Sequence, residues 1–112
     1  MRILGKFYPF PKIEEKINVS KEFIYLHIQP NPFNSFTKIK YYLPKSSNVI
    51  LKIYDVKGEC LKTFVNGRQN AGIYEIKWNR KNDRDKKICE EIYFLRLETN
   101  DCTITNKMII MP

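Results

Sequence analysis

The chain has 112 residues, a length that suits one domain built around one hydrophobic core. Apolar residues make up 43% of it and charged residues 29%, a balance that excludes an intrinsically disordered chain. Twenty Lys and Arg against twelve Asp and Glu give a net charge of +8, which raises the question of an anionic partner. The excess is mostly dispersed lysine, which is typical of solvated sheet faces, so we expect no nucleic acid as a partner.

The composition predicts an all-β fold. Aromatic residues make up 13% of the chain, and Ile and Val recur beside them, which favours strands. Ala71 is the single alanine, although alanine is the best helix former.

The first residues differ from the rest. Residues 1–20 contain Pro9, Pro11 and a charged run without sustained period, so we expect a linker or irregular arm there and a domain over residues 21–112. We find no secretory signal peptide in these residues and no apolar window long enough for a transmembrane segment. If the domain is exported, we expect its export signal to lie elsewhere, most simply on a longer parent protein.

From Phe23 onward, short alternating segments are separated by turn residues, a pattern typical of a sandwich or barrel. About seven antiparallel strands result, which matches an immunoglobulin-like β-sandwich. The expected strands are Phe23–Ile28, Phe36–Leu43, Val49–Tyr54, Glu59–Val65, Tyr74–Trp78, Ile92–Thr99 and Cys102–Met111. Alternation directs one set of side chains to the core: Thr37, Ile39, Tyr41, Leu43, Tyr74, Ile76, Trp78, Tyr93, Leu95, Leu97, Ile104, Met108 and Ile110.

Turn chemistry punctuates these strands. In Asp55-Val-Lys-Gly58, Gly58 can supply the positive φ of a tight turn, and Asp55 can accept backbone N–H bonds that fix it. Asn66-Gly67 and the segment ending at Gly72 are two further expected turns. The polar residues 80–91 are expected to form the longest loop.

The cysteines, the histidine and the aspartates of the loop after Trp78 do not form a pattern typical of a metal site. Three cysteines, an odd number without CxxC spacing, and one histidine, His27, argue against a metal site. We expect the cysteines to be small buried or half-buried residues. The sequence does not decide whether Cys89 and Cys102 form a disulfide. Asp83 and Asp85 have five basic neighbours, which makes a poor calcium site.

The densest local signal is the segment Pro30-Asn31-Pro32-Phe33-Asn34. The two prolines fix two φ angles and favour extended residues before them, so we expect a rigid corner. The asparagine side chains can cap turns, and the phenylalanine can fill the sandwich as a plug. Nothing in the segment performs catalysis.

Six segments, in this order, carry a family resemblance: Pro30–Asn34, Leu43-Pro44, Tyr54–Gly58, Ala71–Trp78, Tyr93–Leu97 and Lys107-Met108. Together they resemble the C-terminal sorting domains of proteins exported by the bacterial type IX secretion system, and the related immunoglobulin-like domain of the flagellar hook-capping protein. The chain departs from the family pattern in the loop after Trp78. Three family glycines are replaced by Arg80, Asp85 and Glu91, which predicts a strained or rebuilt loop.

The resemblance implies a non-catalytic sorting module, attached to an exported parent protein and recognised by secretion machinery. Its carrier would be secreted or held at the cell surface after passing through the periplasm. Lys107, Met108 and Pro112 are the expected recognition residues, because terminal strands offer groups for pairing. Two alternatives are an assembly domain like that of the hook-capping protein and a basic module that binds anionic polymers through the loop from Arg80 to Lys87. We expect no catalytic residue and no cofactor.

Overall fold

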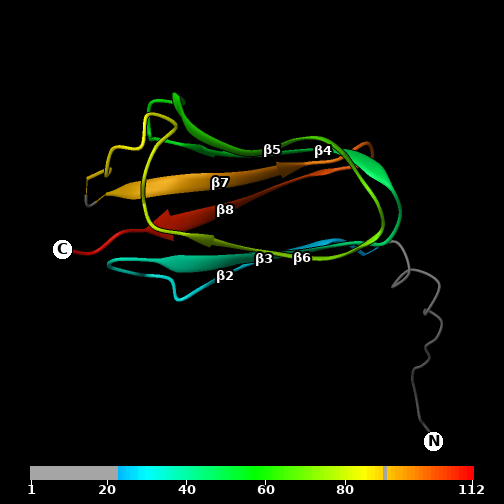
Figure 1. Ribbon diagram of the computed structural model, residues 1–112, viewed down its shortest axis with the longest axis horizontal. Helices are drawn as coiled ribbons and strands as arrows, with labels where there is room; N and C mark the ends of the chain where they lie inside the picture. The colour runs from blue at the N-terminus through cyan, green and yellow to red at the C-terminus, as the bar shows by residue number, and fades with distance from the viewer. Residues whose placement is uncertain (1–22, 90) are drawn as a thin grey trace, which may run out of the picture.

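The computed structural model describes residues 23–89 and 91–112, and the predicted arm at residues 1–20 lies outside this part of the chain. The described residues form antiparallel strands in two facing sheets, as Figure 1 shows. One sheet has the order β2-β3-β6 and the other the order β5-β4-β7-β8. The strands are β2 (Tyr25–Gln29), β3 (Thr37–Leu43), β4 (Ser47–Tyr54), β5 (Cys60–Gln69), β6 (Gly72–Trp78), β7 (Ile92–Glu98) and β8 (Thr103–Ile109). The expected immunoglobulin-like sandwich is confirmed.

The core lies between the two sheets, and the alternation of the strands decides which side chains enter it. The β3 residues from Thr37 to Leu43 alternate between fully buried and exposed or partly exposed positions. In β6 the single Trp78 is 2% exposed, whereas Tyr74 and Ile76 on the same side are half-buried. The central strands contribute the fully buried Val49, Leu51, Ile53, Leu95 and Leu97.

One expected turn is wrong. Asn66-Gly67 lies inside β5, where both residues pair with β4. The local turn preference of the pair is overridden because the backbone ladder to β4 continues as far as Gln69. The ladder instead has two register shifts, one of which leaves Phe64 unpaired between Thr63 and Val65.

The expected burial of the cysteines is also wrong. Cys60, Cys89 and Cys102 are all exposed and all free, so the Cys89–Cys102 disulfide is not formed. Each of them lies at a strand end or in a loop, where the inward and outward alternation of a strand does not apply.

Tyr93 is a core tyrosine with a polar end. The residue is 3% exposed, and its hydroxyl donates to the Cys89 carbonyl at 3.0 Å. Burial, followed by the nearby charge of Glu91, raises the pKa of Tyr93 to about 12. The folded state therefore favours the protonated phenol.

This pKa predicts a loss of stability at alkaline pH. An unfolded tyrosine ionises near pH 10. The stabilisation is therefore complete below pH 10 and is lost as the pH rises toward 12. We expect the unfolding free energy of the wild type, minus that of Tyr93→Phe, to fall between pH 9 and pH 12 in urea titrations. Ionisation of the lysines affects both proteins equally and cancels in this difference. A difference in unfolding free energy that stays constant from pH 9 to pH 12 would contradict the prediction.

Candidate interaction site at the proline corner

Two segments from opposite ends of the described chain meet at one end of the sandwich. The first is the proline corner, residues Pro30–Asn34, which connects β2 to β3. The second is the last segment, residues Lys107–Pro112, which includes the end of β8. Both peptide bonds that precede the prolines of the corner are cis. The contacts between the segments are backbone pairing, side-chain hydrogen bonds and ring packing.

Backbone pairing joins the proline corner to the last segment. Phe33 N–H donates to the Ile109 carbonyl at 3.0 Å, and Met111 N–H donates to the Phe33 carbonyl at 2.7 Å. This is a short parallel bridge centred on Phe33 and Ile110. On its other edge, the Ile110 N–H donates to the Glu91 carbonyl at 3.0 Å. The chain at Ile110 is therefore paired on both edges.

The asparagines of the corner extend this pairing. The Asn31 side chain donates to the Lys107 carbonyl at 2.9 Å and accepts from the Ile109 N–H at 3.0 Å. It thus supplies one donor and one acceptor, as a neighbouring strand would. Asn34 donates from its side-chain amide to the Pro112 carbonyl. The expectation that these asparagines cap local turns is wrong, because β8 is an edge strand whose backbone groups need partners.

A further asparagine links the same two edges of the sandwich. The Asn106 side chain on β8 donates to the Leu26 carbonyl on β2 at 2.8 Å. β2 and β8 are the edge strands of their respective sheets. Asn31 and Asn106 therefore connect the two sheets along one side. The role of Asn106 was missed because its partner lies 80 residues away in the sequence.

Phe33 anchors the corner in the core. It is 2% exposed, and its ring meets the Trp78 ring edge-on with centroids 5.9 Å apart. Phe64 packs against Trp78 at 5.8 Å, also edge-on, and the indole N–H donates to the Lys81 carbonyl at 2.9 Å. The aromatic rings are therefore core packing and not an exposed platform.

Arg80 fixes the corner from the loop side. Its guanidinium donates to the Asn34 and Ile88 carbonyls, both at 2.8 Å, and the residue is 4% exposed. Its φ of 58° is left-handed, as is the φ of 62° at Asp85, so two positions where the family has glycine keep a glycine-like conformation here. Because Arg80 is buried, it does not contribute to a basic surface on the loop from Arg80 to Lys87.

The rest of the loop after Trp78 folds back as a small hairpin. Asn82 accepts from the backbone N–H groups of Arg84 and Lys86, both at 2.9 Å. Asp83 accepts from Thr63 N–H at 3.3 Å and pairs with Lys62 at 3.9 Å, which docks the loop on β5. These carboxylate contacts fix the loop. Glu91 follows Glu90, which lies outside the described residues.

Four other expected motif residues, Asp55, Gly58, Gly72 and Tyr74, lie away from the proline corner. Asp55 Oδ1 accepts from Lys57 N–H and Glu59 N–H, both at 2.9 Å, in a turn that contains Gly58 with a φ of 88°. Gly72 begins β6 with a φ of 151°. Tyr74, two residues later, stacks on Tyr41 with centroids 5.2 Å apart and donates to the Asn70 carbonyl at 2.7 Å.

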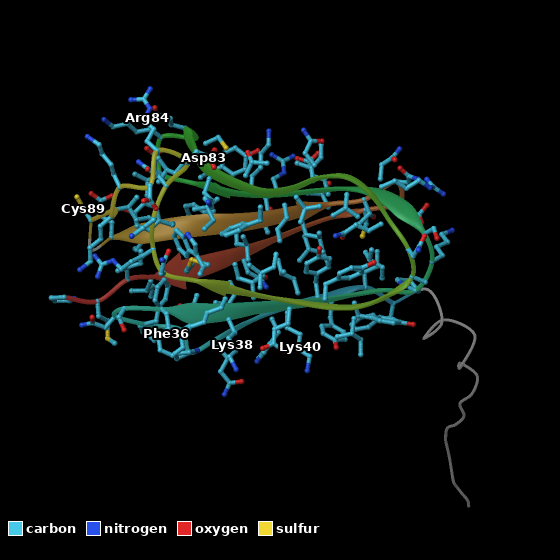
Figure 2. The ribbon with its side chains drawn as sticks, viewed as in Figure 1. Phe36, Lys38, Lys40, Asp83, Arg84 and Cys89 are labelled. Carbon is cyan, nitrogen blue, oxygen red and sulfur yellow. The ribbon has the colours of Figure 1, made fainter. Side chains whose placement is uncertain are left out.

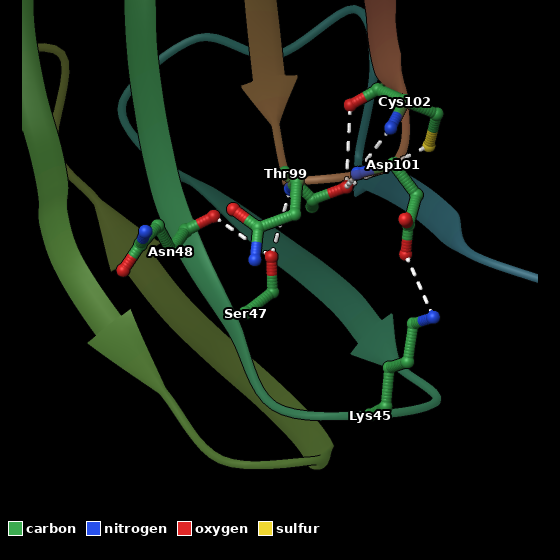
Figure 3. Close-up of polar contacts among 7 residues, drawn as sticks. Lys45, Ser47, Asn48, Thr99, Asp101 and Cys102 are labelled. Carbon is green, nitrogen blue, oxygen red and sulfur yellow. Dashed lines mark hydrogen bonds and ion pairs between the residues drawn. The ribbon is translucent and has the colours of Figure 1, made fainter.

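The opposite end of the sandwich has its own polar cluster, shown in Figure 3. Asn100 N–H donates to the Ser47 hydroxyl at 2.9 Å, which ties the β7–β8 turn to β4. Thr99 Oγ1 accepts from Asp101 N–H at 3.3 Å, and Lys45 pairs with Asp101 at 3.3 Å. Both ends of the sandwich are therefore closed by contacts between segments distant in sequence.

The expected recognition residues are not equally accessible. Lys107 and Pro112 are exposed, whereas Met108 is 0% exposed. A partner cannot touch Met108 without unfolding β8, so its inclusion among the recognition residues is wrong. His27 is an exposed residue of β2 beside Gln29.

Neither a metal cluster nor a membrane helix is found in residues 23–89 and 91–112. No three His, Cys, Asp or Glu side chains in this part converge as metal ligands do. The same residues include no helix with the length and apolarity that crossing a bilayer requires.

Strand order, core and corner define the chain as an immunoglobulin-like β-sandwich with its last strand held by a proline-rich segment. Residues 27–111 match the family described as the secretion system C-terminal sorting domain, and the chain belongs to this family. Its domain is a non-catalytic sorting signal for type IX secretion. Such domains occur on secreted or cell-surface proteins. The resemblance of the six segments is thereby confirmed.

Two solved structures from Porphyromonas gingivalis share the fold. Dimeric latent PorU aligns with 94% of this chain at 20% identity and a TM-score of 0.64. PorZ, an essential surface component of the type IX secretion system, aligns with 78% at 15% identity and a TM-score of 0.53. This chain spans 10% of that PorU chain and 11% of that PorZ chain. No curated protein matches the chain in sequence.

The Asn31 contacts predict a measurable contribution to stability. Asn31→Ala removes two hydrogen bonds to β8, and at about 0.5–1 kcal/mol for each solvent-exposed bond we expect a loss of about 1–2 kcal/mol. Urea unfolding measures the change. Asn48→Ala is the matched control, because Asn48 is also an exposed asparagine but lies on β4, away from the proline corner. Equal effects of the two substitutions would contradict a specific contribution from Asn31.

Proposed function

We propose that export machinery recognises this domain at the proline corner and the last segment, through side chains that the corner holds in place. The observation that carries the proposal is the contrast between side chain and backbone at Lys107. The side chain is exposed, while the Lys107 carbonyl is bound by Asn31. A partner therefore meets a cation that projects from an ordered backbone, so binding does not have to order the strand itself.

The geometry favours side-chain recognition over addition of a partner strand at this point. Strand addition requires free backbone groups along an edge. At Lys107 and Ile109 these groups are already bound by Asn31, and at Ile109 and Met111 by Phe33. The partner would then be a component of the secretion machinery that presents an acidic or polar surface to Lys107.

The function also implies a carrier. We propose that the domain is attached to a parent protein that reaches the cell surface or the medium through the periplasm, and that residues 21–112 form the sorting unit. The family match favours this function over an assembly role like that of the hook-capping protein.

Export of a reporter tests the proposal. The full chain is fused to a periplasmic reporter in a host that has a type IX secretion system, and the external fraction is measured. We expect export of the wild type, and at least a fivefold loss for Lys107→Glu, on the order expected when a charge contact is reversed.

Lys57→Glu serves as the charge-matched control, because Lys57 is exposed in the turn after β4. It should export like the wild type, and both variants should keep the wild-type unfolding midpoint. Retention of the wild-type fusion in the periplasm would refute the sorting function itself. Normal export of Lys107→Glu would refute only the recognition site.

A further inference from the structure

A basic depression lies on the outer face of the three-stranded sheet. It has a volume of about 370 Å³, and its lining includes Lys38 and Lys40 of β3 and Phe36, which directly precedes β3 at the same alternate spacing. Figure 2 shows these three side chains on the side of the sheet that faces away from the sandwich interior. His27 and Gln29 of β2 and Glu75 of β6 flank them.

Two of the lysines on this face repel each other in the folded state. The β3–β6 register places Lys38 directly opposite Lys77, and like charges in such a pair are destabilising. Among the described residues, three lysines lie on this face, at positions 38, 40 and 77, beside one carboxylate, that of Glu75. Glu75 pairs with Lys38 at 3.5 Å. Among the described residues, Lys40 has no ion pair.

Phe36 adds an apolar contact beside these charges. It is 40% exposed, so part of its ring is accessible to a ligand. The Lys77 ammonium lies 4.4 Å from the centre of its ring. With one ring face next to this cation, Phe36 offers its edge and remaining surface to a ligand.

We propose that this face binds an extended acidic peptide segment of another protein. Side chains two residues apart on a strand point the same way and lie about 6.6–6.8 Å apart. A peptide with carboxylates at alternate positions therefore matches Lys38 and Lys40, and an apolar side chain two positions earlier meets Phe36. Charge complementarity selects the acidic peptide, and the apolar contact sets its register.

A nucleic acid or a sulfated polysaccharide fits this face less well. Binding of such polyanions grows with the number of neutralised anionic groups, and only three lysines are gathered here. Glu75 also stands among them and would repel a dense row of phosphates or sulfates. Two or three carboxylates, separated by neutral residues, match the number of cations.

The test uses a synthetic peptide with a leucine, followed by glutamates at the second and fourth positions after it, and threonines between. It is titrated into the full, isotopically labelled chain at low salt, and amide chemical shifts are followed by NMR. We expect saturable shifts in β3 and at Lys77. We expect affinity to fall at least about tenfold in K38E/K40E, and also when glutamines replace the peptide glutamates.

The control variant is K52E/K57E, which makes the same charge change on the other sheet and its turn. It should bind within about twofold of the wild type at the same salt. The absence of saturable shifts would overturn the proposal, as would equal losses in the two double variants. Displacement of the peptide by a heparin tetrasaccharide that binds more tightly would make the face a polyanion site instead. None of these outcomes depends on export.

Discussion

The fold depends on how the outer edge of β8 obtains hydrogen-bond partners. An edge strand exposes backbone groups that favour pairing with any available chain. Here the partners come from the proline corner, since Phe33 supplies backbone groups and Asn31 supplies a side-chain amide. The last segment thereby becomes part of the sandwich rather than a loose end, and it contributes the buried Met108 and Ile110 to the core.

The corner can do this because several contacts hold it in place. Thr37 Oγ1 donates to the Pro30 carbonyl at 2.6 Å, and the Arg80 guanidinium donates to the Asn34 carbonyl. The Phe33 ring rests on Trp78, which is itself held by the loop through the Lys81 carbonyl. Corner, loop and last segment therefore constrain one another. This mutual constraint explains how the left-handed conformation of Arg80 is stabilised although the residue is not glycine.

Much of this architecture was predictable from the sequence, because strand alternation is a local signal. The burial of Thr37, Ile39 and Tyr41 on one side of β3 follows from a period of two. The prediction of a turn at Asn66-Gly67 was wrong, because backbone pairing with β4 overrides the local turn preference of these two residues. Local sequence does not reveal this pairing. The cysteines were misplaced because composition-based burial does not apply at strand ends and in loops.

The candidate site was only half predictable. Phe33 could be recognised as a core residue of the proline corner, but the partners of Asn31 lie 76 and 78 residues away, and no local rule indicates them. Arg80 could not be distinguished from its basic neighbours, since only the fold shows that its guanidinium enters the interior. The exposure of Lys107 beside the buried Met108 follows from alternation.

We infer that the proline corner and the last segment open only when the whole sandwich unfolds. Native-state hydrogen exchange of the Phe33, Ile109 and Met111 amides tests it most directly. We expect these amides to exchange with the same opening free energy as core amides such as those of Leu51 and Leu95. Exchange of the three amides through a low-energy local opening, while the core amides stay protected, would contradict it.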